Sequence, residues 1–402
     1  MARPRFTGSF TQQLPIPEAG IEAATAVLRS GRLHRYNIAP GEDPEVVALE
    51  REYAAWQGAR YCLAVASGGQ AMQIALRAAG VRSGDKVLTN AFTLAPVPGA
   101  IAAVGAEAVL VEITGNLVID LDDLAGKAAA SGAKLLLLSN MRGHLCDMER
   151  LLEVTKPAGV RVIEDCAHTM GARWNGRLSG NFGLAGCFST QTYKHMNSGE
   201  GGFLTSDDAE FMARAIMLSG SYMLYHRHGA APEPEVFATI RLETPNLSAR
   251  MDNLRAAILR PQLARLDDSI AAWNARYDRV ARGLAQHPSI RLPVRPVQEF
   301  YVGSSIQFLI PGIAPDTAKA LVERLAAAGV ELKWFGSAEP VAFTSAHQSW
   351  RFVRPQALPQ TDGVLSGLFD MRLPLTFSLE DCDLIAAHIC DAATDLRMAG
   401  AA

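Results

Sequence analysis

The sequence predicts an α/β protein, with a mostly parallel sheet between helices in a large domain and a smaller α+β C-terminal domain. Three observations favour this fold class. Short apolar runs alternate with Ala-rich amphipathic stretches from about residue 60 to 205, a long helical pattern begins at residue 251, and 402 residues suffice for roughly two or three domains. We expect a large domain with an N-terminal arm over residues 1–250, and a linker helix with a small domain over residues 251–402.

Six short segments rich in Val, Ile and Leu are the expected strands of the sheet. They are residues 86–89, 108–111, 134–138, 161–164, 186–188 and 203–205. Helical patterns separate them, such as residues 71–79, which stop at Gly80. Because parallel strands of this kind present their carboxyl ends at one edge, we expect ligand sites there.

The C-terminal part begins with the helical pattern, which follows loop-like residues 229–235 and runs to about residue 285. We expect a kink at Pro261, since proline removes a helical hydrogen bond. Further on, the pattern predicts a small domain made of a strand over residues 306–310, a helix over residues 317–328 and a closing helix over residues 379–397.

Composition excludes several classes of protein. The 38 Lys+Arg against 41 Asp+Glu give a formal charge of −3, so we expect neither nucleic acid nor a membrane surface as a partner. With 49% hydrophobic and 20% charged residues, the chain is neither disordered nor fibrous. The six cysteines are scattered without ligand spacing, so we expect no metal site, and the lack of an apolar leader or spanning stretch predicts a cytoplasmic location.

A glycine-bearing loop runs directly into the helix expected at residues 71–79. Its sequence, Ala66-Ser67-Gly68-Gly69-Gln70, places free N–H groups at a helix N-terminus, which suits a phosphate. An ordinary helix start would have the same sequence, so the loop alone does not identify a phosphate site.

Two charged residues lie at the ends of apolar runs. Asp165 follows residues 160–164, where a partly desolvated carboxylate needs a cationic partner, such as a protonated pyridine nitrogen. The alternative is an Asp that caps the next helix. Lys194 lies among small and polar residues between two strands, where a lysine can form a Schiff base with an aldehyde cofactor, although most lysines are solvated surface charges.

The order of these residues resembles the DegT-type (DegT/DnrJ/StrS) sugar and cyclitol aminotransferases, fold-type-I enzymes that use pyridoxal 5′-phosphate. The resemblance covers nearly the whole chain, from Gly31-Arg32-Leu33 through Ser67-Gly68 and Glu164-Asp165 to the Ser189/Lys194 pair and the closing helix. It implies an aminotransferase that moves an amino group from an amino acid, Glu or Gln being expected, to a keto sugar, cyclitol or related ketone in biosynthesis. It also implies a homodimer with shared active sites.

The resemblance assigns a role to each matching residue. Lys194 would form the Schiff base and shuttle protons, and Asp165 would pair with the pyridinium nitrogen. His168 would lie near the phenolic oxygen of the cofactor. The remaining implied cofactor contacts are Gly68, Gly69, Gln70 and Ser189 at the phosphate, Leu94 at the position of the aromatic that stacks on the ring, and Ser248 reaching the phosphate from the neighbouring subunit.

Departures from the family's pattern leave alternatives open. Ser-Gly-Thr becomes Ser67-Gly68-Gly69, and the stacking aromatic becomes Leu94, so Phe92 could take a shifted role. Arg142, in Asn-Met-Arg-Gly where members have His-Leu-Tyr-Gly, could bind a substrate carboxylate or form a surface salt bridge.

Two further sets of residues have two interpretations each. Trp334 could line the substrate mouth or belong to the core. Arg32, His34 and Arg35 could help to cover the substrate site or belong to a solvated loop.

Other reactions would need the same residues. A lyase, dehydratase or epimerase with this cofactor would also need Lys194 and Asp165. The dehydratase relatives replace the lysine with histidine, so Lys194 favours transamination. A non-catalytic regulator is a third possibility, which the joint presence of Asp165, Ser189 and Lys194 disfavours.

Overall fold

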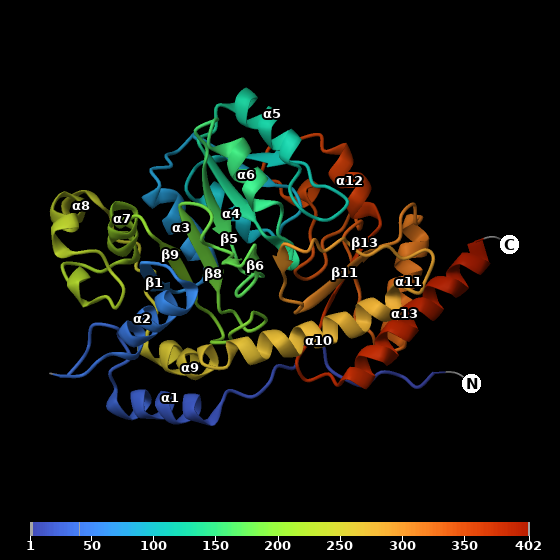
Figure 1. The fold of residues 1–402 in the computed structure, drawn as a ribbon, viewed down its shortest axis with the longest axis horizontal. Helices are drawn as coiled ribbons and strands as arrows, with labels where there is room; N and C mark the ends of the chain where they lie inside the picture. The colour runs from blue at the N-terminus through green and yellow to red at the C-terminus, as the bar shows by residue number, and fades with distance from the viewer. Residues whose placement is uncertain (1–2, 40, 401–402) are drawn as a thin grey trace.

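A seven-stranded sheet forms the centre of the molecule. The computed structural model describes residues 3–39 and 41–400, with side chains described through residue 395 (Figure 1). The strand order is β1-β9-β8-β5-β4-β2-β3, and only β9 pairs antiparallel with its neighbours, so the predicted mostly parallel sheet is confirmed. The strands are β1 (Tyr61–Val65), β2 (Lys86–Asn90), β3 (Glu107–Val111), β4 (Leu135–Ser139), β5 (Arg161–Asp165), β8 (Ala185–Ser189) and β9 (Gly202–Ser206).

All six expected strands are present, each within about two residues of its predicted bounds, whereas β1 was not predicted. The expected helix at residues 71–79 is α3, which begins three residues earlier, at Gly68, because the Ser67 hydroxyl accepts the N–H of Gln70 and caps the helix there.

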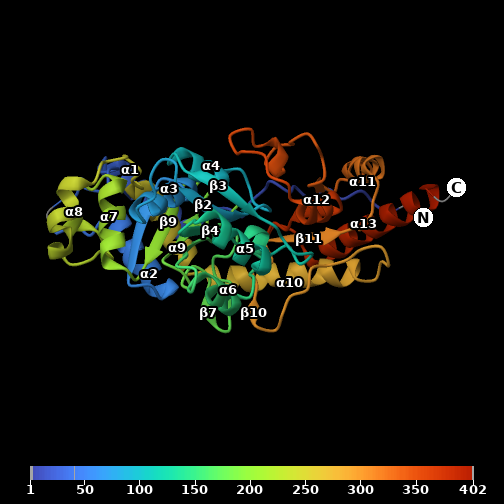
Figure 2. The same cartoon turned by 90° about the horizontal axis from the view of Figure 1, so that it is seen from above.

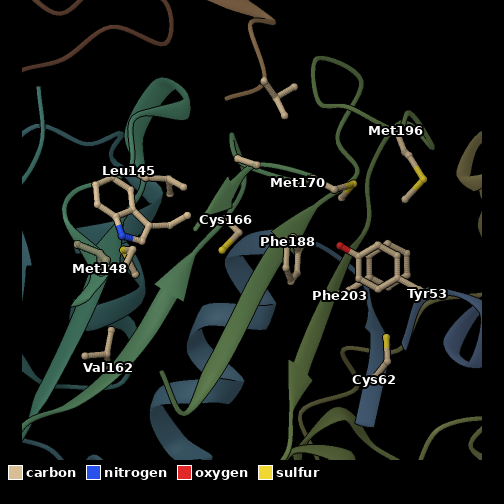
Figure 3. Packing of buried hydrophobic residues seen from close by; sticks show 14 of the residues in the cluster. Tyr53, Cys62, Leu145, Met148, Val162, Cys166, Met170, Phe188, Met196 and Phe203 are labelled. Carbon is tan, nitrogen blue, oxygen red and sulfur yellow. The ribbon is translucent and has the colours of Figure 1, made fainter. Parts of the chain in front are cut away.

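Helices cover both faces of the sheet. One face packs against α2 (Glu45–Gln57), α5 (Leu121–Ser131), α6 (Met148–Thr155) and α9 (Asn253–Leu263), and the other against α3 (Gly68–Ala78), α4 (Pro96–Ala103), α7 (Ala209–Ser219) and α8 (Phe237–Glu243). Leu136 and Leu138 of β4 enter the first core and Leu135 and Leu137 the second, as strand alternation requires. Figure 3 shows the first core, where the Tyr53 and Phe203 rings stack with centres 4.0 Å apart.

The long helical pattern forms two helices. Pro261 lies inside α9, and the chain breaks between Leu263 and the start of α10 (Leu266–Leu284). The helix ends shortly after Pro261, where Arg265 N–H bonds the Gln262 carbonyl in a tighter turn, and the kink expected at Pro261 stays a prediction. From there α10 runs from beneath the sheet to the C-terminal part of the molecule (Figures 1 and 2).

The C-terminal part is the smaller α+β unit that the sequence predicts. Its antiparallel sheet has the order β11-β13-β12. The elements are β11 (Ser305–Leu309), α11 (Pro315–Ala327), β12 (Lys333–Trp334), α12 (Pro359–Ser366), β13 (Leu368–Arg372) and α13 (Leu379–Gly400). Trp334 is buried in its core and donates from Nε1 to the Ser366 carbonyl at 2.8 Å, so it is a core residue.

The N-terminal segment joins this C-terminal core. Phe6 and Phe10 pack edge-on against Phe377, with ring centres 5.0 and 4.9 Å from it, and the two chain ends lie on the same side of the molecule (Figure 1). After this segment, α1 (Glu18–Ser30) runs alongside α9. The domain division at residue 250 stays a prediction.

A small third sheet joins strands of the large part to residues 299–300 of the C-terminal part, and a buried ion pair lies in the large part. The sheet consists of β10 (Glu299–Phe300), β6 (Arg173–Trp174) and β7 (Arg177–Leu178). Arg35 is buried and lies 2.9 Å from the buried Glu50 and 2.9 Å from His228 Nδ1. Although burial raises the pKa of Glu50, Arg35 and His228 outweigh it and lower that pKa to about 2. Arg35 therefore neither covers the substrate site nor lies in a solvated loop.

No helix in the described ranges is both long and apolar enough to cross a lipid bilayer.

Candidate active site

A cavity of about 380 Å³ lies at the carboxyl edge of the central sheet. The ends of β4, β5 and β8 meet there, as parallel strands in such a sheet do. Of the predicted site residues, the cavity is lined by Gly68, Gly69, Leu94, Asp165, His168, Ser189 and Lys194. Residues that the sequence placed as far apart as 68 and 194 therefore share one site.

Lys194 stands in the loop between β8 and β9. Its backbone N–H donates to the Gln191 carbonyl at 2.8 Å, and Thr190 N–H bonds Gly201 across the base of the loop at 2.9 Å. The Nζ atom lies 2.8 Å from His168 Nε2. Burial lowers the pKa of Lys194 to about 7, with Arg142 and Arg372 adding to the fall and Asp165 opposing it. Much of this amine is therefore uncharged, and hence nucleophilic, near neutral pH.

His168 is held neutral beside that amine. Burial, followed by the charges of Lys194 and Arg142, lowers the pKa of His168 well below its usual value. A neutral imidazole can accept a hydrogen bond from the lysine or donate one to it, so the 2.8 Å contact holds the amine in place.

Asp165 is buried at the end of β5. Its Oδ1 accepts the N–H of Ala167 at 3.1 Å, and its Oδ2 accepts the hydroxyl of Ser139 at 3.2 Å. The residues that follow form turns, so Asp165 is not a helix cap. Burial raises the pKa of its carboxyl, whereas Lys194 and these two hydrogen bonds lower it. A carboxylate in this position is stabilised by a cationic group in the cavity.

The N-terminus of α3 closes one end of the cavity. Gly68 lies so close to β8 that a Cβ added to it would meet the Cβ of Ser189 at 2.8 Å. Ser189 presents a buried hydroxyl that accepts the Gln191 N–H at 3.3 Å. A helix N-terminus, a glycine that permits close approach and a hydroxyl form a cradle that fits a phosphate.

Gln70 and Ser248 are not among the residues that line the cavity. The Gln70 N–H donates to the Ser67 hydroxyl at 3.1 Å. Ser248 is exposed, with a φ of 52°, and its N–H bonds Asn246 Oδ1 at 2.9 Å. Its predicted contact with a neighbouring subunit stays a prediction.

Leu94, and not Phe92, faces the cavity. Phe92 is buried and packs edge-on against Phe335, with ring centres 5.2 Å apart. At this position the wall of the cavity is therefore aliphatic.

Arg142 lies in a buried turn after β4, where it has a φ of 56°. Its Nη2 lies 2.8 Å from Oδ2 of the buried Asp370, so the pair is not a surface salt bridge. Arg32 pairs with the nearby Glu42, and neither Arg32 nor His34 is among the cavity-lining residues.

Sequence reasoning missed several lining residues. Thr93 donates to Ser139 at 2.7 Å, and Ser139 donates to Asp165, which makes a polar chain beneath the cavity. Ser139 ends the apolar run of β4, and the rule about carboxyl ends could have identified it. Arg372 comes from the distant β13, and no local signal marks it.

This geometry defines a class of enzyme. One cavity holds a half-buried lysine with a lowered pKa, a buried carboxylate and a phosphate cradle. These groups fit an aldehyde, a basic ring nitrogen and a phosphate, which together describe pyridoxal 5′-phosphate. Within the described ranges, no group of three or more metal-ligating side chains is arranged to hold an ion.

The chain belongs to the DegT/DnrJ/EryC1/StrS aminotransferase family, whose model matches residues 16–390. It is 32% identical over 291 residues to the 3-amino-5-hydroxybenzoate synthase of Amycolatopsis mediterranei, covering 71% of this chain and 72% of that protein. It is 28% identical over 387 residues to a putative L-glutamine:3-amino-2,3-dideoxy-scyllo-inosose aminotransferase of Streptoalloteichus tenebrarius, covering 92% and 88%.

A solved structure supports the same family assignment. The crystal structure of 3-amino-5-hydroxybenzoic acid synthase superposes with a TM-score of 0.82 at 26% identity, covering 98% of this chain and 100% of the other. The protein is thus a pyridoxal-phosphate-dependent aminotransferase of this family.

Proposed function

We propose that this enzyme moves an amino group from L-glutamate or L-glutamine to a keto sugar, cyclitol or related ketone in a biosynthetic pathway of the cytoplasm. The contact between Lys194 Nζ and His168 Nε2, in the same cavity as the buried Asp165, carries the proposal, because it holds a nucleophilic amine beside a carboxylate. The names of the relatives, which include an L-glutamine-dependent cyclitol aminotransferase, support the donor and the acceptor class.

Each residue has a distinct task in this proposal. Ser189 and the N–H groups at Gly68 and Gly69 bind the phosphate, and Asp165 keeps the ring nitrogen protonated. The bound cofactor supplies the electron sink that amino transfer requires. Lys194 Nζ attaches the cofactor and moves the proton at the substrate carbon, with His168 holding the amine in place.

A homodimer with shared sites is part of the proposal. Ser248 lies in an exposed loop, and Tyr222 and Met223 are exposed large side chains, 55% and 53% accessible. Apolar surface of this kind favours an interface between copies. Sedimentation velocity tests it, and a fully active monomer would exclude shared sites.

The test of the reaction is spectroscopic. Purified protein loaded with pyridoxal phosphate should lose its yellow absorbance when L-glutamate or L-glutamine is added, and should recover it when a ketone acceptor follows. Lys194→Ala should abolish the attached-cofactor spectrum and turnover, whereas Lys319→Ala, an exposed lysine on α11, should change neither. A lyase, dehydratase or epimerase would leave the spectrum unchanged after a range of amino donors.

A further inference from the structure

Two arginines from distant parts of the chain face the same cavity as Lys194. Arg142 follows β4 and Arg372 ends β13. The Arg372 guanidinium carbon lies 3.8 Å from the centre of the Tyr193 ring and 5.5 Å from that of Phe343. Aromatic faces hold a guanidinium in place while its N–H edge stays available to an acceptor in its plane.

Arg142 has donor capacity that the protein does not use. It is 5% exposed, and its Nη2 pairs with Asp370 Oδ2 at 2.8 Å, but among the described residues its buried Nε has no hydrogen-bond partner. The other carboxylate oxygen of Asp370, Oδ1, accepts a hydrogen bond from Gln307 Nε2 at 2.8 Å. A buried guanidinium in this state is stabilised by an anion that aligns with its N–H groups.

Positive side chains outnumber negative ones at the end of the cavity where Arg142 and Arg372 lie. Asp370 offsets one of the two arginines, Asp165 lies at the lysine, and Glu200 lines the cavity from an exposed loop position. Lys333 lies close by: burial lowers its pKa to about 8, Arg142 and Arg372 lower it further, and Asp370 opposes the fall. This end of the cavity would therefore attract an anion.

We infer that Arg142 and Arg372 form a subsite for a substrate carboxylate, and that this subsite sets the specificity of the enzyme for substrates that carry one. The inference rests on the proposed transamination, since the carboxylate belongs to the amino donor or to the ketone acceptor. The planar guanidinium edges match a planar carboxylate, which accepts two parallel hydrogen bonds.

A single carboxylate fits this subsite better than a diphosphate. A cavity of about 380 Å³ lies near the lower end for small-molecule sites, which leaves little space for a nucleotide beside the cofactor.

The test measures binding without turnover. Calorimetric titration of the cofactor-loaded protein with cyclohexanecarboxylate should show binding, and the neutral cyclohexanecarboxamide should bind weakly. Arg142→Gln and Arg372→Gln should each weaken carboxylate binding about 10- to 100-fold and leave carboxamide binding unchanged. Arg372→Gln leaves no unpaired buried charge behind, so it serves if Arg142→Gln folds poorly.

Asp370→Asn should have the opposite effect on carboxylate binding. The amide oxygen can still accept from Gln307, but the charge that competes for Arg142 is gone, so cyclohexanecarboxylate should bind more tightly. A merely structural role for the pair would weaken binding in both Arg142→Gln and Asp370→Asn. Carboxylate binding that is unchanged in both arginine variants, or binding of uridine diphosphate that depends on Arg142 in place of carboxylate binding, would overturn the inference.

The half-reaction with L-glutamate separates the two sources of the carboxylate. If the donor uses the subsite, Arg142→Gln raises the L-glutamate concentration for half-maximal bleaching by at least about 10-fold. If the acceptor uses it, that concentration is unchanged while cyclohexanecarboxylate binding is lost. Arginine-dependent carboxylate binding in a protein that no amino donor bleaches would refute the proposed function and leave this inference standing.

Discussion

The lowered pKa of Lys194 predicts the pH range in which the apoprotein binds its cofactor rapidly. Only the neutral amine attacks an aldehyde, and the pKa is about 7 where an ordinary lysine has 10.5. At about pH 7.5, roughly three quarters of this amine is neutral, against about 0.1% of an ordinary lysine, which is a several-hundredfold advantage. The rate of pyridoxal phosphate uptake should therefore rise with pH to a plateau, with its midpoint near 7.

Two substitutions should move that midpoint in opposite directions. Asp165→Asn removes a negative charge that favours the protonated amine, so the midpoint should fall below 7. Arg142→Gln removes a positive charge, so the midpoint should rise. Stopped-flow absorbance of the apoprotein, with Nα-acetyl-lysine as the control for the ionisation of the cofactor itself, measures all three curves. A wild-type midpoint near 10, or shifts of the same sign in both variants, would refute this reasoning.

Five substitutions at positions other than Lys194 test the rest of the structure. Gly68→Ala should lower the free energy of unfolding, measured in urea, by about 1–3 kcal/mol and should weaken cofactor binding, because the added Cβ meets the Ser189 side chain at 2.8 Å. Gly69→Ala is the control: the nearest atom to its added Cβ is 3.7 Å away, so this variant should fold normally. Glu50→Gln should cost about 3–5 kcal/mol, measured in the same way, since it breaks a buried ion pair. In the wild type, the folded pKa of Glu50 is about 2, below its ordinary 4.5, so its contribution is full above about pH 4.5 and is lost as the pH falls toward 2. Leu94→Ala should raise the dissociation constant of the cofactor with little change in melting temperature, and Phe92→Leu should do the reverse, so equal effects on both quantities would contradict the assigned positions.

The sequence predicts the sheet and the two central residues because both depend on local patterns. Apolar runs identify the strands, and the rule that ligands bind at carboxyl ends identifies Asp165 and, with the family's pattern, Lys194. Arg372 and Asp370 escape such reasoning, since only the packing of the C-terminal sheet brings them to Arg142. The local sequence places Arg35 in a polar turn, and only its distant buried partner Glu50 reveals that it is buried.

The packing of Phe6 and Phe10 against Phe377 has a consequence for the order of folding. Arg3 also pairs with Asp391, 388 positions later, so the first part of the described chain completes a core whose other half is synthesised last. Contacts this distant form late, because a long loop must close before they are gained. During synthesis the aromatic side chains near the start remain uncovered until helix α13 has left the ribosome. Deleting α13 should therefore leave an apolar surface uncovered and promote aggregation of the protein, even though the central sheet and Lys194 are present in full.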